Sequence, residues 1–263
     1  MSNIFINSEN INTSSLSSKF SIWFNSSLGR MVYAAEIEQL ESILQGLFGY
    51  HILQYGYFAE SNYLSSSRIA NKSTLLLDNT EINNNITAIY TSAEQLPIAM
   101  DCVDVIVLPH ILEYSKDIHK ILQELERVLI DDGHVVIIGI NPLSLWGLWH
   151  FFKCWSGEMP WRGRLLLISR LKNWLSLSNF EVKELNRFFF LPPLNNRNLL
   201  KKLVPLELLG RYCWPIFGGL YVVVARKRTA PLNPIKIQWR AKRNMIMTRI
   251  IENIIRIAIK KNE

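Results

Sequence analysis

One histidine of this sequence stands where a catalytic base would be expected. His110 follows the apolar run from Val103 to Leu108, and Glu113 lies one helical turn further along. Ligands of an open sheet of parallel strands bind beyond the carboxyl ends of the strands, so a residue directly after such a run faces the expected crevice. A histidine there could accept a proton from a substrate. The alternative for this lone histidine is a structural or merely exposed side chain.

Patterns for several other chemistries are absent from the sequence. It contains no G-x-S-x-G, no G-x-x-x-x-G-K-[ST] and no H-E-x-x-H arrangement. The three cysteines, Cys102, Cys154 and Cys213, are widely separated and form no C-x-x-C pair. A disulfide scaffold and a structural metal are therefore not expected, and free thiols in a reducing compartment are the simplest interpretation.

Short apolar runs alternate with helical stretches along the chain, and these elements must position the candidate residues. The runs expected to be strands are 51–55, 73–77, 86–90, 103–108, 134–140, 180–185 and 220–225. Apolar residues recur at helical spacing over 28–47, 115–129 and 165–175. This alternation predicts an α/β fold with a doubly wound, seven-stranded sheet and helices on both faces. Residues 103–108 are expected at its centre, and the last strand is expected to be antiparallel.

Two motifs in the middle of the chain carry a family resemblance. The first is TSAEQLPI at residues 91–98, followed by DCVDVI at 101–106, and the second is RVLIDDG at 127–133. They resemble the D-A-E-x-L-P-F…D-x-S-F-D-V-V run and the R-V-L-x-P-G-G helix stop of class I S-adenosylmethionine-dependent methyltransferases, in particular the type-11 family. The similarity covers residues 45–140 well. It implies a Rossmann-like methyltransferase sheet and S-adenosylmethionine as the cofactor.

The resemblance also implies a cofactor site made by Gly56, Asp78, Ser92, Ala93 and Pro109. Gly56 matches the first glycine of the motif after the first strand, where a missing side chain lets the backbone approach the cofactor. Asp78 would bind the ribose hydroxyls, and Ser92 would accept a hydrogen bond from the adenine amino group. Ala93 would offer its backbone amide to adenine, and Pro109 would border the crevice. As alternatives, Gly56 is a turn glycine and Asp78 begins a loop.

The glycine motif departs from the family pattern in ways that predict weak cofactor binding. Gln54 replaces the acid that ends the first strand, and Phe58 and Glu60 replace two later glycines. A bulky ring restricts the approach of the cofactor, and a carboxylate at residue 60 would lie near the cofactor's own carboxylate. Ser92 replaces the family's adenine-binding acid. We therefore expect S-adenosylmethionine to bind more weakly than in relatives with an intact motif.

Aromatic residues gather after the fifth expected strand, where the family builds part of its substrate wall. They are Trp146, Trp149, Phe151, Phe152, Trp155 and Trp161, joined later by Phe188, Phe189, Phe190 and Trp214. Core packing explains most of such a group, and an apolar substrate pocket or a surface patch is the alternative.

Positive charge is concentrated at the end of the sequence. The chain has a net charge of +7, and residues 226–263 hold eleven Lys/Arg against two acids, so that residues 1–225 carry −2. Apolar residues at helical spacing from Ile246 to Ile259 predict an amphipathic basic helix. We expect a polar arm over 1–27, a methyltransferase-like domain over 28–228 and a basic amphipathic tail over 229–263. The tail could dock on its own domain, or contact a polyanion such as an anionic membrane or RNA.

Methyl transfer from S-adenosylmethionine to an unknown acceptor is the predicted function, with His110 as the candidate base. The reduced glycine motif favours one alternative, a catalytically inactive binding or scaffold protein. The uneven charge favours another, a peripheral membrane or RNA-associated protein that acts through its tail. No basic segment followed by an apolar one opens the sequence, so a cytoplasmic location is expected. The oligomeric state stays open.

Overall fold

The computed structural model describes residues 14–56, 62–76, 88–90, 96–153, 160–194, 210, 212 and 214–228. The chain divides into two compact units, Met1–Thr229 and Ala230–Glu263, and all of the described residues belong to the first. Among them, no helix combines the length and the apolar composition that crossing a bilayer requires. The predicted tail over 229–263 lies outside the described residues.

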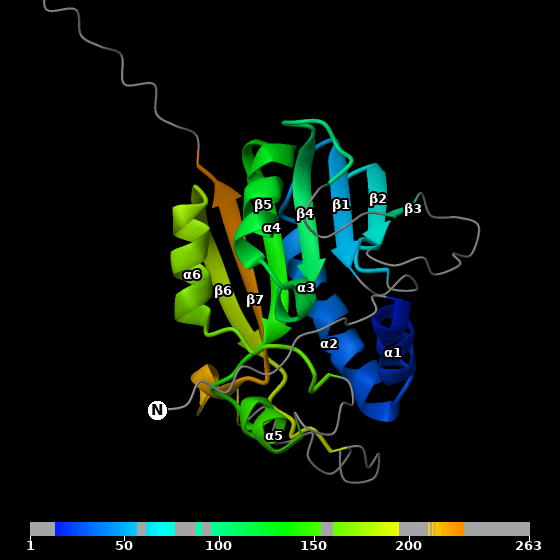
Figure 1. The fold of residues 1–263 in the computed structure, drawn as a ribbon, viewed down its shortest axis with the longest axis vertical. Helices are drawn as coiled ribbons and strands as arrows, with labels where there is room; N and C mark the ends of the chain where they lie inside the picture. The colour runs from blue at the N-terminus through cyan, green and yellow to red at the C-terminus, as the bar shows by residue number, and fades with distance from the viewer. Residues whose placement is uncertain are drawn as a thin grey trace, which may run out of the picture. The chain divides into compact units, whose positions relative to one another are not determined.

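The described strands form one sheet of seven strands at the centre of the first unit (Figure 1). These strands are β1 (His51–Gly56), β2 (Asn71–Leu76), β3 (Ala88–Tyr90), β4 (Val103–Pro109), β5 (Leu129–Ile140), β6 (Phe180–Phe188) and β7 (Leu220–Lys227). Their order is β3-β2-β1-β4-β5-β7-β6. The first five pair in parallel, whereas β7 runs antiparallel to both β5 and β6. The predicted Rossmann-like α/β class with an antiparallel last strand is confirmed.

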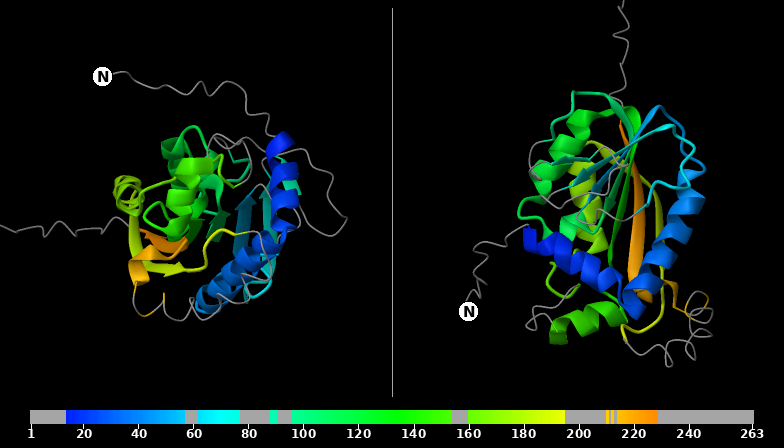
Figure 2. Two further views of the ribbon diagram at one scale, coloured as in Figure 1. Left: turned by 90° about the horizontal axis from the view of Figure 1, so that it is seen from below. Right: turned by 90° about the vertical axis from the view of Figure 1, so that its right-hand side faces the viewer.

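Helices lie on both sides of this sheet (Figure 2). One face is covered by α2 (Ser27–Leu44), and the other by α4 (Ile118–Val128) and α6 (Ile168–Leu177). Four further elements lie toward the end to which β1, β4 and β5 point: α1 (Ser14–Phe24), α3 (Ile111–Tyr114), α5 (Leu145–Lys153) and the 3-10 turn η2 (Pro215–Phe217). The carboxyl ends of the parallel strands therefore lie close to these four elements.

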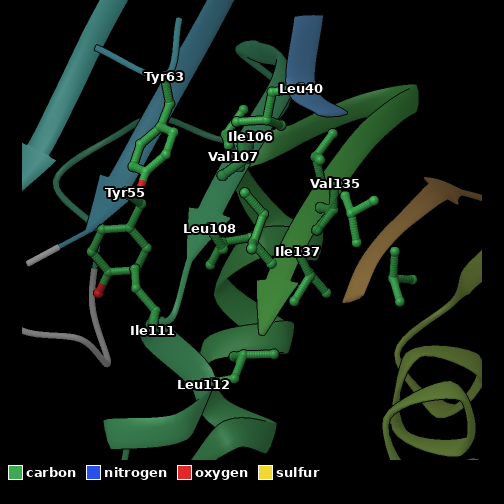
Figure 3. Close-up of a cluster of buried hydrophobic side chains, with 14 of the residues drawn as sticks. Leu40, Tyr55, Tyr63, Ile106, Val107, Leu108, Ile111, Leu112, Val135 and Ile137 are labelled. Carbon is green, nitrogen blue, oxygen red and sulfur yellow. The ribbon is translucent and has the colours of Figure 1, made fainter. Parts of the chain in front are cut away.

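Apolar side chains of the central strands and of α4 form the core. In β4 and β5, successive side chains are buried on both faces, among them Ile106, Val107 and Val135 (Figure 3). Strands covered on both faces favour such continuous β-branched runs. In α4, the buried residues recur three and four apart, and the Asp117 carboxylate caps the helix by accepting from the Lys120 amide. This packing holds the carboxyl end of β4 in place.

The structure corrects the prediction of a polar arm over 1–27, because residues 14–24 form α1. Phe20 and Phe24 lie four residues apart on one side of this helix and are buried in the core. Phe20 packs edge to face on Tyr114 of α3, and Phe24 does so on Tyr33 of α2. The many Ser and Asn residues around them conceal this apolar pair in the sequence.

The helix predicted over 115–129 is confirmed as α4, and the separate turn α3 precedes it. Residues 145–153, expected only as an aromatic cluster, form α5. The described residues between β1 and β2, 62–70, form turns. The missed elements all lie near the carboxyl ends of the strands, where local spacing is a weak guide.

Candidate active site

Two of the five predicted cofactor residues end neighbouring strands. Gly56 is the last residue of β1, and Pro109 is the last residue of β4. The two strands are parallel, with Gln54 opposite Val107. Gly56 and Pro109 therefore lie side by side at the carboxyl ends of the strands, and both are buried. Doubly wound sheets bind their ligands at the carboxyl ends of the parallel strands.

The other three predicted residues, Asp78, Ser92 and Ala93, lie outside the described residues. The strands that precede them in the chain, β2 and β3, are parallel neighbours, with Leu76 opposite Tyr90. Their assignment as cofactor ligands stays a prediction.

His110 follows β4 directly and lies between two buried carboxylates. Its Nε2 is 2.8 Å from Oε1 of Glu36 in α2, and its Nδ1 is 3.3 Å from Oε2 of Glu113 in α3. The residue has a left-handed backbone, with φ of 54°, at the junction of β4 and α3. A side chain in this region is uncommon and often belongs to a functional site.

Further hydrogen bonds occupy the remaining oxygens of both carboxylates. The Tyr63 hydroxyl donates to Oε2 of Glu36 at 2.7 Å, and the backbone N–H of Ile140 donates to Oε1 of Glu113. The carboxylates of Glu36 and Glu113 thereby join α2, α3, the turn after β1 and the end of β5. We call His110, Glu36, Glu113 and Tyr63 the histidine cluster.

Gly139 makes room for one side of the histidine cluster. A Cβ atom at this position would lie 2.6 Å from the Tyr221 hydroxyl and 3.0 Å from Oε1 of Glu113. The first contact is too short and the second is tight, so a side chain at residue 139 would displace Tyr221 or Glu113. Burial and then the charge of Glu113 raise the pKa of the Tyr221 hydroxyl, which keeps it neutral.

Charge in the histidine cluster keeps the imidazole protonated. Burial alone lowers the pKa of His110, but the negative charges of Glu36 and Glu113 outweigh it and raise the pKa to about 10. Both ring nitrogens therefore donate to carboxylates at neutral pH. A group in this state does not take up a proton, so the geometry favours a positioning role for His110 over the predicted role of base.

One formal negative charge is left on the histidine cluster, because two carboxylates face one imidazolium. Tyr63 adds no positive charge, and its own pKa is raised well above the ordinary value by burial and by Glu36. A buried, uncompensated charge is costly unless a group of opposite charge approaches it. The carboxyl end of β4 is therefore suited to a cationic ligand.

Sequence reasoning found His110 but missed Glu36 and Tyr63. Glu36 does carry a signal, because it lies four residues after Val32 and four before Leu40, on the buried side of α2. A carboxylate on the apolar face of a helix requires a buried partner. Tyr63 lies in a polar stretch without regular spacing of apolar residues, so the sequence gives no indication that its side chain is buried.

The two motifs of the family resemblance contact each other. The Arg127 guanidinium donates to the carbonyls of Leu96 and Ile98, at 3.0 and 2.8 Å, and pairs with Glu124 of its own helix. Glu124 in turn accepts from the Leu96 amide. The loop before β4 is thereby fixed to α4.

Asp104, in the first motif, has a structural role. Its Oδ2 accepts from the backbone amides of Tyr50 and His51, both at 2.9 Å. These bonds fix the start of β1 beside β4.

An open apolar pocket of about 400 Å³ lies beside α5. It is lined by Leu143, Ser144, Leu145, Leu148, Phe190, Gly210, Trp214 and Phe217. Its one polar side chain, Ser144, donates to the Asn141 carbonyl and accepts from the Gly147 amide. The Asn141 side chain donates to the carbonyls of Ile216 and Gly218, which ties the end of β5 to η2. The pocket thus offers a ligand apolar contact almost throughout.

The predicted aromatic group divides between the core and the surface. Trp146 and Trp161 are buried and pack on each other, and Phe189 packs edge to face on Trp146. Phe190 and Trp214 line the pocket, whereas Phe151 and Phe152 are exposed on α5. Core packing, an apolar pocket and a surface patch therefore all occur in this group. Trp155 lies outside the described residues.

Known proteins resemble this chain in both sequence and fold. A family described as a methyltransferase domain matches residues 62–137. The uncharacterized protein YafS of Escherichia coli K12 is 32% identical over 216 residues, which cover 81% of this chain and 84% of YafS.

Solved structures with low sequence identity share the fold. A methyltransferase from Thermotoga maritima is 15% identical with a TM-score of 0.62, and the match covers 82% of this chain and 98% of that one. A methyltransferase from Mesorhizobium loti is also 15% identical, with a TM-score of 0.52, over 72% and 96% of the two chains. The architecture is that of a class I methyltransferase. The chain belongs to the class I S-adenosylmethionine-dependent methyltransferases of type 11, and S-adenosylmethionine is its cofactor.

The residues at the carboxyl edge of β1 and β4 fit that cofactor. S-adenosylmethionine carries a positive sulfonium, and the histidine cluster beside Pro109 holds one uncompensated negative charge. Attraction between opposite charges is strong where burial lowers the local dielectric. Gly56, without a side chain, ends the strand beside Pro109.

Proposed function

We propose that this chain transfers a methyl group from S-adenosylmethionine to an acceptor with a large apolar part. The observation that carries the proposal is the negatively charged histidine cluster at the same end of the sheet as an apolar pocket of about 400 Å³. The first feature suits a cation, and the second suits an apolar molecule. Methyl transfer requires both reactants to be held in line.

The cofactor would be held by Gly56, Asp78, Ser92, Ala93 and Pro109. When bound, S-adenosylmethionine supplies an electrophilic methyl group on its sulfonium. The carboxylates of the histidine cluster would attract this positive charge, and that attraction would offset part of what the reduced glycine motif loses.

His110 would act by holding Glu36 and Glu113 in place. Because its imidazole is already protonated at neutral pH, it would not remove a proton from the acceptor. This favours an acceptor atom that reacts through a lone pair or an existing negative charge, since such a nucleophile needs no base.

The acceptor class can be tested with methyl-labelled S-adenosylmethionine and a lipid extract. We expect label in compounds that an organic solvent extracts, and none in protein or RNA. Leu148→Trp, which fills the pocket, should reduce this label about tenfold or more, the effect of losing about 1.4 kcal/mol. The control Leu177→Trp changes an exposed residue of α6 and should leave the label unchanged. Label in water-soluble products alone, or equal loss in both variants, would contradict the proposal.

A further inference from the structure

A group of large apolar side chains is exposed around α5 and η2. They are Leu143, Leu145, Leu148, Trp149, Phe151, Phe152, Trp214, Ile216 and Phe217, which we call the α5–η2 face. Phe152 is 72% exposed, Trp214 58% and Leu148 57%. Residues of both elements line the same pocket, so the face is continuous. Soluble domains rarely expose such a group unless it binds something.

The location of the α5–η2 face leaves it accessible. Helix α5 lies outside the layers formed by the sheet and its covering helices, at the end to which β5 points (Figures 1 and 2). Only Trp146 and Gly147 of this helix are buried. A nine-residue helix with apolar side chains around most of its surface cannot bury them against one neighbouring element.

The part of the sequence that contains the α5–η2 face is rich in positive charge. Residues 141–225 contain eleven Lys/Arg and four Asp/Glu, whereas residues 1–140 contain seven and sixteen. Arg162 and Arg164 are exposed in the turn after α5, and the His150 imidazole of α5 donates to the Gly163 carbonyl between them at 2.8 Å. The described residues of the stretch 141–180 include no acid. The apolar face is thus bordered by cations.

We propose that the α5–η2 face docks on the surface of an anionic lipid bilayer. Leucine and aromatic side chains insert at the boundary between headgroups and acyl chains, as they do in interfacial helices. Arg162 and Arg164 contact the lipid phosphates, and the excess of cations in this half of the chain adds long-range attraction. The pocket opens on this face, so an apolar acceptor reaches it directly from the bilayer. The docking does not depend on the proposed methyl transfer.

Vesicle binding by the full-length chain tests the docking surface. The probes are vesicles of phosphatidylglycerol with phosphatidylcholine and vesicles of phosphatidylcholine alone, separated from free protein by flotation. We expect the native chain to prefer the anionic vesicles, and the double variant Leu148→Glu, Phe152→Glu to lose about tenfold or more in partitioning. The control Ser176→Glu, Leu177→Glu adds the same two negative charges at exposed positions of α6 and should bind as the native chain does. Unchanged binding by the double variant would overturn the proposal.

Tryptophan quenching separates the face from the basic tail. Brominated acyl chains quench tryptophans that enter the bilayer, at about 0.5 M salt to screen the tail. The double variant Trp149→Phe, Trp214→Phe removes both exposed tryptophans of the face and should remove most of the quenching, whereas Trp239→Phe, in the tail, should remove little. The reverse result would assign binding to the tail and overturn the proposal. The proposal would also be overturned if the chain bound single-stranded RNA but not vesicles. It would likewise be overturned if Leu148→Glu, Phe152→Glu only converted a dimer into a monomer.

Discussion

At the scale of single residues, the histidine cluster couples protonation to the packing of α2. Glu36 is fully buried, and the distance from the His110 imidazole to its carboxylate is shorter than the distance to the carboxylate of Glu113. Removing one partner of a buried ion pair leaves the other charge uncompensated, at a cost of about 3–5 kcal/mol. Changes that retain the shape of the side chain and remove only its charge are therefore the most informative.

The first prediction concerns Glu36→Gln. Without the charge of residue 36, burial should lower the pKa of His110 by more than about one unit. The imidazole resonances in an NMR titration report this value. Glu38→Gln, at an exposed position of the same helix, is the matched control and should leave the titration unchanged. An unaltered pKa in Glu36→Gln would show that this contact does not determine the protonation of His110.

The second prediction is a pH dependence of stability. The pKa of His110 in the folded chain is about 10, above the ordinary 6.5, so the stabilisation is complete below about pH 6.5 and is lost as the pH rises through about 10. The free energy of unfolding should fall by up to about 1.4 kcal/mol per pH unit between these limits. Urea titrations of the native chain and of His110→Gln give the two slopes. Parallel slopes would contradict the assigned protonation.

Candidate residues could be predicted where one strand determines their position. Gly56, Pro109 and His110 each occur at the end of an apolar run, and the structure has them at strand ends. Glu36 reaches His110 from a helix far earlier in the sequence, a juxtaposition that only the packed fold creates. The protonated state of His110 was unpredictable for the same reason, because it depends on that distant carboxylate.

At the scale of elements, α1 is an integral part of the core. Phe24 is 5% exposed and packs on Tyr33 and Trp23, whereas Ile22 on the same helix is 73% exposed. Phe24→Ala removes a buried ring and leaves a cavity, so the free energy of unfolding should fall by about 3–5 kcal/mol. Ile22→Ala should change it by less than about 0.5 kcal/mol. Chemical denaturation of both variants measures the difference, and equal stabilities would mean that α1 is not packed as described.

The sequence predicts an element well where its apolar residues recur at a regular period and lie on one buried face. Helix α4 is such a case, because its buried residues recur at the helical period. Helix α5 lacks this period, since its apolar side chains are mostly exposed, and α1 combines two buried rings with a polar composition. Both were missed because their burial depends on neighbours that the local pattern does not contain.

At the scale of the whole molecule, the chain divides into two units, Met1–Thr229 and Ala230–Glu263. The second unit lies outside the described residues, and its sequence carries much of the positive charge. Truncation after Arg228 should leave the melting temperature within about 2 °C, because the core belongs to the first unit. It should also lower the salt dependence of polyanion binding, since fewer counterions are released. A large drop in melting temperature would instead identify the tail as a core element.

The overall architecture was predictable because strand runs and helical periods alternate in one consistent order along the chain. Residues 103–108 were expected at the centre, and β4 occupies that place, while β7 runs antiparallel as expected. The position of the α5–η2 face was not predictable, because it depends on how segments after β5 and before β7 meet.

Direct titration of the full-length chain with S-adenosylmethionine, by calorimetry, tests the central claim of a cofactor site at the carboxyl ends of β1 and β4. We expect saturable binding by the native chain and no binding by Gly56→Val. Gly46→Val should bind as the native chain does, because a Cβ atom there meets only ordinary contacts. Ser92→Asp should tighten binding by about 1–3 kcal/mol, because it restores a charge-assisted hydrogen bond. Absence of saturable binding by the native chain, or equal affinity in Gly56→Val, would contradict the account.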